Sequence, residues 1–189
     1  MTFAFEDCSD GELAALSIVD RNGGFQVLMQ RYEGRIYRVV RGLVGDPDEA
    51  LDLVQETFVA AYLALGRYDA ARPFGAWVTR IALNKCRDWG RRRAVRRLFA
   101  FAVPLEADAH DVASDTVAID DALHDRQVLA RVGRAIPELP ARLKEPLILC
   151  TVDGLSQAEA AAALGISEKA VETRIRRARA ALAERMSQR

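Results

Sequence analysis

Six arginines crowd a short segment that also contains aromatic and amide side chains. They are Arg87, Arg91, Arg92, Arg93, Arg96 and Arg97. Guanidinium groups at this density can bind a phosphate backbone, and such binding would depend strongly on salt. The aromatic and amide groups, Phe74, Trp77, Asn84 and Trp89, are of the types that stack on or hydrogen-bond to an unpaired base. This chemistry suits single-stranded nucleic acid, although charge runs are often simply solvated and tryptophans more often belong to a core.

A second polar cluster lies near the C-terminus, on a segment with the pattern of a helix-turn-helix. Ser156 and Glu159 form a capping-box pattern, Gly165 supplies a turn, and Ser167 can cap the next helix. That helix has an apolar stripe of Val171, Ile175, Ala178 and Leu182. Opposite it lie Lys169, Thr173, Arg176 and Ala180, flanked by Glu172 and Arg177. Because arginine can read guanine or clamp phosphates, this polar stripe is the candidate major-groove reader; a solvated cationic face is the alternative.

A third candidate surface is a compact polar face on the helix predicted over residues 47–65. Its buried stripe consists of Ala50, Val54, Thr57, Ala61 and Leu65. Another face of the helix gathers Asp52, Gln55, Glu56 and Val59. A polar face with one apolar neighbour can dock a partner helix, although periodicity alone favours a plain solvated surface.

Other kinds of chemistry have little support in the sequence. Cys8, Cys86 and Cys150 are far apart and show no paired spacing, so neither a disulfide framework nor a metal site is predicted. His110 and His124 sit in or beside an acidic stretch, far from any paired carboxylate motif. No cofactor is expected. An acidic start and the absence of a long apolar run predict a cytoplasmic protein that does not insert into membranes.

The elements that position these clusters are all predicted to be helices, because apolar residues recur at three- and four-residue spacing. Capping residues and prolines place helix starts. The predicted helices are 10–19, 24–44, 47–65, 73–97, 120–136, 140–152, 156–164 and 168–186. Pro146 falls inside one of them and is expected to kink it.

Charge divides the chain into modules although its formal net charge is zero. Residues 21–97 contain fifteen Lys and Arg against eight acids, and residues 126–189 contain twelve against seven. Between them, residues 98–125 contain seven acids and no Lys or Arg. We therefore predict two small helical domains, residues 1–97 and 120–189, joined by an acidic flexible linker over 98–119.

Three blocks in this order resemble the extracytoplasmic-function sigma factors of the sigma-70 class, over nearly the whole chain. They are DLVQETFVAAY (52–62), RPFGAWVTRIALNKCRDWGRRR (72–93) and GLSQAEAAAALGISEKAVETRIRRARAAL (154–182). Helix-turn-helix motifs are common, so the first half is what discriminates. The resemblance implies a non-catalytic specificity subunit of RNA polymerase, with a region 2-like bundle followed by a region 4-like helix-turn-helix. It also implies control by an anti-sigma factor.

The resemblance further implies a role for each polar cluster. Core RNA polymerase would be bound by Asp52, Gln55, Glu56 and Phe58. The promoter −10 element would be melted and read by Trp77, Arg80, Asn84, Lys85, Arg87, Arg91 and Arg92, and Asn84 falls where the family captures a flipped base. The −35 duplex would be read by Ser167, Lys169, Glu172, Thr173, Arg176 and Arg177. Glu172 departs from relatives that have a basic residue there, which leaves the exact −35 sequence open.

Three rival interpretations remain from the sequence. An ordinary helix-turn-helix regulator, acting on duplex DNA without being a polymerase subunit, explains residues 154–186 but leaves residues 50–97 unexplained. A small helical enzyme would need converging acid/base or metal groups. An adaptor could use sigma-like helices for protein contacts alone, and polymerase-dependent transcription would separate it from a true sigma factor.

Overall fold

The computed structural model describes residues 5–19, 23–100 and 129–187, and within these ranges the chain is helical and has no strand. The all-α prediction is confirmed. The first group of elements is a 3-10 turn (Phe5–Asp7), α1 (Asp10–Val19), α2 (Gly23–Val44), α3 (Pro47–Ala64), a second 3-10 turn (Leu65–Arg67) and α4 (Phe74–Ala100). The second group is a helical segment over 129–135, α6 (Ala141–Thr151), α7 (Gln157–Leu164) and α8 (Glu168–Ser187). None of the helices in the described ranges is both long enough and apolar enough to span a membrane.

The helices lie close to their predicted positions. The largest difference concerns α4, which ends at Ala100 instead of at residue 97 and so enters the segment expected to be linker. The rest of that linker falls outside the described residues. Of the helix predicted over 120–136, the structure describes the part from residue 129, which is helical to residue 135.

Helix starts follow the predicted capping chemistry. The Asp46 side chain accepts hydrogen bonds from the backbone N–H groups of Asp48 and Glu49, and Pro47 occupies the first turn of α3. Ser156 and Glu159 form the reciprocal capping box at the start of α7. Each cap satisfies N–H groups that have no partner within the helix, which fixes where the helix begins.

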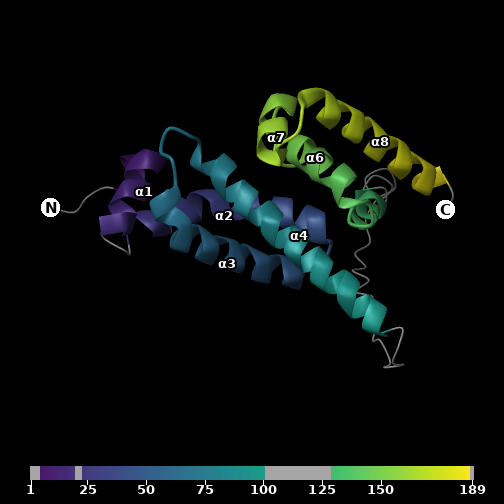
Figure 1. The fold of residues 1–189 in the computed structure, drawn as a ribbon, viewed down its shortest axis with the longest axis horizontal. Helices are drawn as coiled ribbons and strands as arrows, with labels where there is room; N and C mark the ends of the chain where they lie inside the picture. The colour runs from purple at the N-terminus through teal and green to yellow at the C-terminus, as the bar shows by residue number, and fades with distance from the viewer. Residues whose placement is uncertain (1–4, 20–22, 101–128, 188–189) are drawn as a thin grey trace, which may run out of the picture.

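The core of the first group lies among α2, α3 and α4, with α1 packed on the end of α2 (Figure 1). Phe74 at the start of α4 is fully buried, and its ring lies 5.4 Å from the rings of Tyr32, Tyr68 and Trp77. Aromatic side chains bury large areas in edge-on and tilted contacts, so this cluster anchors the start of α4.

The second group has a core of small and branched side chains. Ala160 and Ala161 of α7 and Val171 and Ile175 of α8 are buried, α7 packs on α8, and α6 packs on both helices. Gly165 ends α7 with φ +67°, a left-handed conformation that most L side chains avoid. The thin alanine helix and this sharp turn set α8 across α7 in the geometry of a helix-turn-helix.

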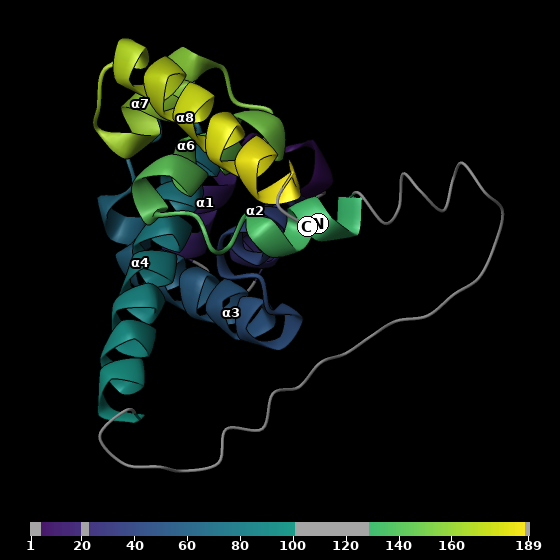
Figure 2. The ribbon, with the colours of Figure 1, turned by 90° about the vertical axis from the view of Figure 1, so that its right-hand side faces the viewer.

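The two groups pack directly on one another. In the view of Figure 2, α6, α7 and α8 form a unit seated on the first group, where α6 contacts α2 and α7 contacts α4. Two glycines of the α2 end permit this approach. A Cβ atom at Gly42 would lie 2.7 Å from Cδ1 of Ile148, and one at Gly45 would lie 2.6 Å from Cγ of Pro137. Side chains at these positions would collide with the second group.

Candidate functional site

The polar face of α3 exists as predicted and is wider than predicted. Asp52, Gln55, Glu56 and Val59 line one shallow groove of about 470 Å³, together with Ala60, Leu63 and Lys85. Lys85 reaches across from α4, and its ammonium lies 3.2 Å from a carboxylate oxygen of Glu56. Val59 and Leu63 are 60% and 78% exposed. The groove therefore combines carboxylates with an apolar edge.

Phe58 does not belong to this surface. It is only 3% exposed, and its ring packs edge-on against Phe25, 6.4 Å away between centroids. It lies four residues after Val54 and three before Ala61, both buried, so it belongs to the core-facing side of α3. Phe58 can support the polar face from beneath, but its side chain cannot contact a partner there.

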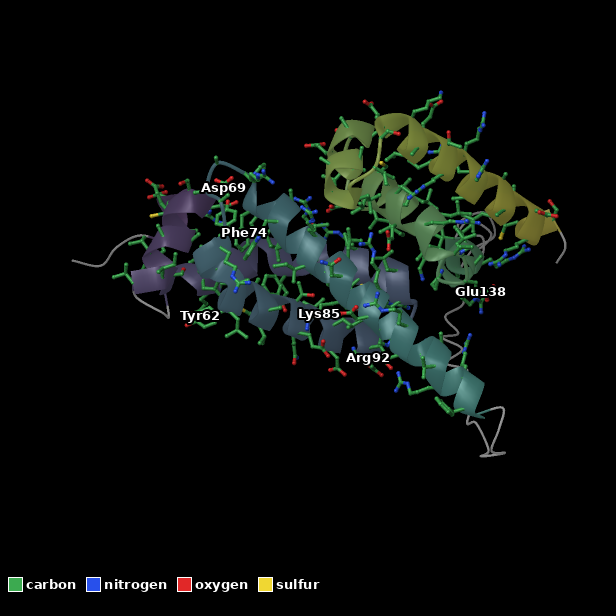
Figure 3. The ribbon with its side chains drawn as sticks, in the orientation of Figure 1. Tyr62, Asp69, Phe74, Lys85, Arg92 and Glu138 are labelled. Carbon is green, nitrogen blue, oxygen red and sulfur yellow. The ribbon has the colours of Figure 1, made fainter. Side chains whose placement is uncertain are left out.

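The predicted cationic stripe of α4 is mostly exposed. Arg80, Asn84, Arg91 and Arg92 are exposed, and Figure 3 shows Arg92 further along α4 than Lys85. On the opposite side, Val78, Ala82 and Trp89 are buried in the core. This division between polar and apolar sides agrees with the periodicity of the sequence.

The two tryptophans near this stripe are packed differently. Trp77 is half-buried, and its ring lies 5.1 Å from Tyr68 in the loop before α4. Trp89 is buried, donates its Nε1–H to Glu49 of α3 at 2.7 Å, and is covered by the guanidinium of Arg93. Trp89 is therefore a core residue, whereas Trp77 keeps an edge near the surface.

Arg87 has a partner that the sequence did not suggest. Its Nε and Nη2 donate to the two carboxylate oxygens of Glu145 in α6, at 2.8 and 2.7 Å. Its Nη1 also points to Oδ1 of Asn84 at 3.4 Å. The Glu145 side chain is 8% exposed, and its hydrogen bonds raise the pKa of Arg87. A member of the α4 stripe is thus held by the second group of helices.

A second ion pair of this kind joins Arg35 of α2 to Asp153, which lies two residues after the end of α6. The Arg35 Nε donates to one carboxylate oxygen, and Nη2 lies 2.9 Å from the other. The Asp153 side chain has no exposed surface, and the pair raises the pKa of Arg35. Sequence reasoning missed both acids. A sign was present, because Glu145 directly precedes the apolar run PLILC (146–150) and Asp153 follows it by three residues, and such a run is expected to be buried.

The polar face of α8 carries the remaining predicted residues. Lys169, Glu172, Arg176 and Arg177 are exposed, and Thr173 is half-buried. Lys169 pairs with Glu172 at 2.7 Å, a contact that lowers the pKa of Glu172. Ser167 has a capping role, since its Oγ accepts from the backbone N–H of Ala170 at 3.2 Å. The helix itself lies on the outer side of α6 and α7 (Figure 1).

A cleft of about 620 Å³ lies between α4 and α6. Its walls include Cys86, Arg87 and Trp89 from α4 and Lys144 and Glu145 from α6. Burial raises the pKa of the Cys86 thiol to about 12 and lowers the pKa of the Lys144 ammonium. The Lys144 ammonium donates to the backbone carbonyls of Leu43 and Pro137 at 2.6 and 3.0 Å, so it too bridges the two groups. Across the described ranges, no three acid, histidine or cysteine side chains gather as a metal site would need.

Comparison with known families agrees with the two groups of helices. Residues 28–97 match the family model for sigma-70 region 2, and residues 129–182 match that for sigma-70 region 4. The chain belongs to the sigma-70 family. The RNA polymerase sigma factor CnrH of Cupriavidus metallidurans is 40% identical over 177 residues, which cover 92% of both proteins. The ECF RNA polymerase sigma factor SigF of Caulobacter vibrioides is 37% identical over 147 residues, covering 78% of this chain and 76% of SigF.

A solved structure supports the same placement. The structure of CnrH in complex with the cytosolic domain of CnrY superposes with a TM-score of 0.67 at 34% identity, covering 95% of this chain and 97% of the other. The chain is therefore a sigma factor of the extracytoplasmic-function group, which directs promoter-specific transcription initiation. The region 2 match contains the α3 groove and most of α4, and the region 4 match contains α6, α7 and most of α8.

Proposed function

We propose that three surfaces of this sigma factor divide its work. The α3 groove binds core RNA polymerase, the exposed stripe of α4 melts and reads the −10 element, and the exposed face of α8 reads the −35 duplex. The observation that carries the proposal is that both cationic helix faces, one in each matched region, present their polar side chains outward from buried apolar stripes.

For the polymerase contact, the α3 groove offers acids, an amide and an apolar edge on one helix face. Asp52 and Gln55 are exposed, and Glu56 is partly neutralised by Lys85. Val59 and Leu63 would give the partner an apolar contact, which is the usual centre of a protein interface. A partner helix with basic and apolar residues fits this surface. Phe58 contributes by holding α3 in place.

For the −10 element, the α4 stripe supplies what unpaired DNA requires. Unpairing costs a few kcal/mol, which contacts to an extruded base and to the single-strand backbone can offset. Asn84 presents an exposed amide for the base, and Arg80, Arg91 and Arg92 follow the backbone. Trp77 and the aromatic cluster at the start of α4 hold the adjoining loop.

For the −35 element, the support is that α8 follows the short α7 and the Gly165 turn, the order in which a helix-turn-helix presents its recognition helix. Arg176 and Arg177 can contact bases or phosphates. Glu172 stands beside Lys169, so this corner of the face can accept a hydrogen bond as well as donate one.

The partners and the location follow from this role. A sigma factor contributes binding and DNA melting to the polymerase, so no covalent chemistry is assigned to this chain, and it would act in the cytoplasm where the polymerase works. The CnrH structure was solved with the cytosolic domain of CnrY. By this likeness we extend control by an anti-sigma factor to the present chain.

Run-off transcription tests the proposal. Purified core polymerase and a genomic fragment library are incubated with and without this protein. Transcripts that start only in its presence, downstream of a shared two-part element, are the expected result. Reversing the charges of Asp52 and Glu56 to Arg should abolish them, whereas the same reversal at the exposed Glu184 of α8 should not. Specific duplex binding without any initiation would favour the helix-turn-helix regulator instead.

A further inference from the structure

The first and second groups of helices, which contain the region 2 and region 4 matches, are called the first and second domains below. The interface between them is built from charged groups as well as apolar side chains. Within the described residues, the Arg35–Asp153 and Arg87–Glu145 pairs cross it, and Lys144 donates to carbonyls on both sides. Each acid is almost fully buried by the contact, with side-chain exposures of 0% for Asp153 and 8% for Glu145. Both pairs are bidentate, the geometry that makes arginine–carboxylate contacts strong and directional.

The packed arrangement is incompatible with reading a promoter. The −10 and −35 elements of a promoter lie about 25 base pairs apart, which is about 85 Å of duplex at about 3.4 Å per base pair. Here α8 packs on α7 and α7 packs on α4. Since packed helices have axes about 8–10 Å apart, α8 and α4 approach within about 20 Å of each other. The proposed contact residues span only about 23 Å of α4 (residues 77–92) and about 15 Å of α8 (residues 167–177), so the two surfaces together reach no more than about 60 Å. The domains must separate before both elements are bound.

The contact also occupies part of the −10 surface. Glu145 engages Arg87, and Arg87 in turn points to the amide oxygen of Asn84. A carboxylate of the second domain thus takes the place that a DNA phosphate would take on this arginine. Binding of Glu145 and binding of DNA at Arg87 exclude each other.

We propose that the Arg35–Asp153 and Arg87–Glu145 pairs form an intramolecular latch that holds the free sigma factor closed, with Glu145 as a stand-in for the DNA backbone. The closed state is the resting state of the chain, and polymerase binding selects the open one. Apparent affinity for the polymerase then falls in proportion to the small fraction of open molecules. The effect on transcription rests on the proposed function, but the closure itself does not.

The latch is tested with substitutions outside the three proposed binding surfaces. Glu145→Gln combined with Asp153→Asn removes both charges and keeps the shapes. Glu138→Gln is the matched control, because Glu138 pairs with Arg185 inside the second domain. Small-angle X-ray scattering of the free chain measures compaction, and fluorescence titration measures affinity for core polymerase. Thermal unfolding confirms that each variant is folded.

The double variant should show a larger radius of gyration than the native chain and about tenfold tighter polymerase binding, while Glu138→Gln matches the native chain. Exchanging one pair, Arg35→Asp with Asp153→Arg, should restore compaction relative to Asp153→Arg alone. An unchanged radius of gyration in the double variant would overturn the latch. Failure of all forms to bind polymerase would count against the proposed function and leave the scattering result to decide the latch.

Discussion

The two helices that we propose contact DNA, α4 and α8, differ in how their cations are held. On α4, Lys85 pairs with α3, Arg87 pairs with α6 and Arg91 pairs with Asp88 of its own helix. On α8, Lys169 pairs with Glu172 one turn away, and Arg176 and Arg177 are exposed. The α8 face proposed to read the duplex therefore has its printed ion pair within the helix, whereas the α4 face proposed to read the single strand is tied at Lys85 and Arg87 to neighbouring elements. A duplex can be bound as it stands, but the side chains that hold an unpaired strand can bind it only once the base pairs have opened.

The largest effect is expected from removing Phe74, the centre of the aromatic cluster that holds the start of α4. Phe74→Ala should destabilise the first domain by about 3–5 kcal/mol, because a fully buried ring leaves a cavity. Urea unfolding followed by tryptophan fluorescence measures this, since Trp77 and Trp89 both belong to α4. Phe99→Ala, at a ring that is 71% exposed, is the matched control and should change stability little. Equal losses in both variants would contradict the assignment of the anchor.

The melting role of α4 is tested at Asn84. Asn84→Ala should reduce promoter opening about 30-fold, or about 2 kcal/mol, because the extruded base loses its amide contact. Permanganate footprinting of the −10 element measures opening, and polymerase binding should be unchanged. Gln157→Ala removes an exposed amide from α7 and serves as the control. Normal permanganate reactivity with Asn84→Ala would end this assignment.

The duplex role of α8 is tested at Arg176. Arg176→Ala should weaken binding to the −35 duplex about tenfold, with Arg134→Ala as an exposed control away from the face. Fluorescence anisotropy across a salt series also separates two modes. Loss of a phosphate clamp lowers the salt slope by about one, whereas loss of a base contact relaxes specificity at one position. An effect as large with Arg134→Ala would place the reading face elsewhere.

The smallest expected effect concerns the positioning of α8. Ser156→Ala removes the cap of α7 and should cost about 1 kcal/mol of local stability. Hydrogen exchange of the α7 amides should then quicken about fivefold. Ser187→Ala, at a hydroxyl near the end of α8, should leave α7 unchanged. Protection of α7 equal to that of the native chain would show that packing alone fixes its start.

Local features were predictable because they depend on neighbours in the sequence. The caps at Asp46 and Ser156, the Gly165 turn and the buried stripes of α3 and α8 all follow from spacing of three or four residues. Phe58 shows where prediction from the resemblance stops. Matching a family motif assigned it to the polymerase-binding set, but the match does not tell whether its side chain points to the surface or into the core. The partners of Arg87 and Arg35 lie 58 and 118 residues away, and no periodicity connects such positions.

The buried thiol of Cys86 can serve as a natural reporter of separation between the two domains. A thiol with a pKa of about 12 carries almost no thiolate at neutral pH, so alkylating reagents should react slowly with Cys86 while the packed domains bury it. Cys8 and Cys150 are each partly accessible and should be modified first. The slow phase of an alkylation time course should then come from Cys86. Its rate would report how often the two domains separate, and the measurement needs no attached fluorophore.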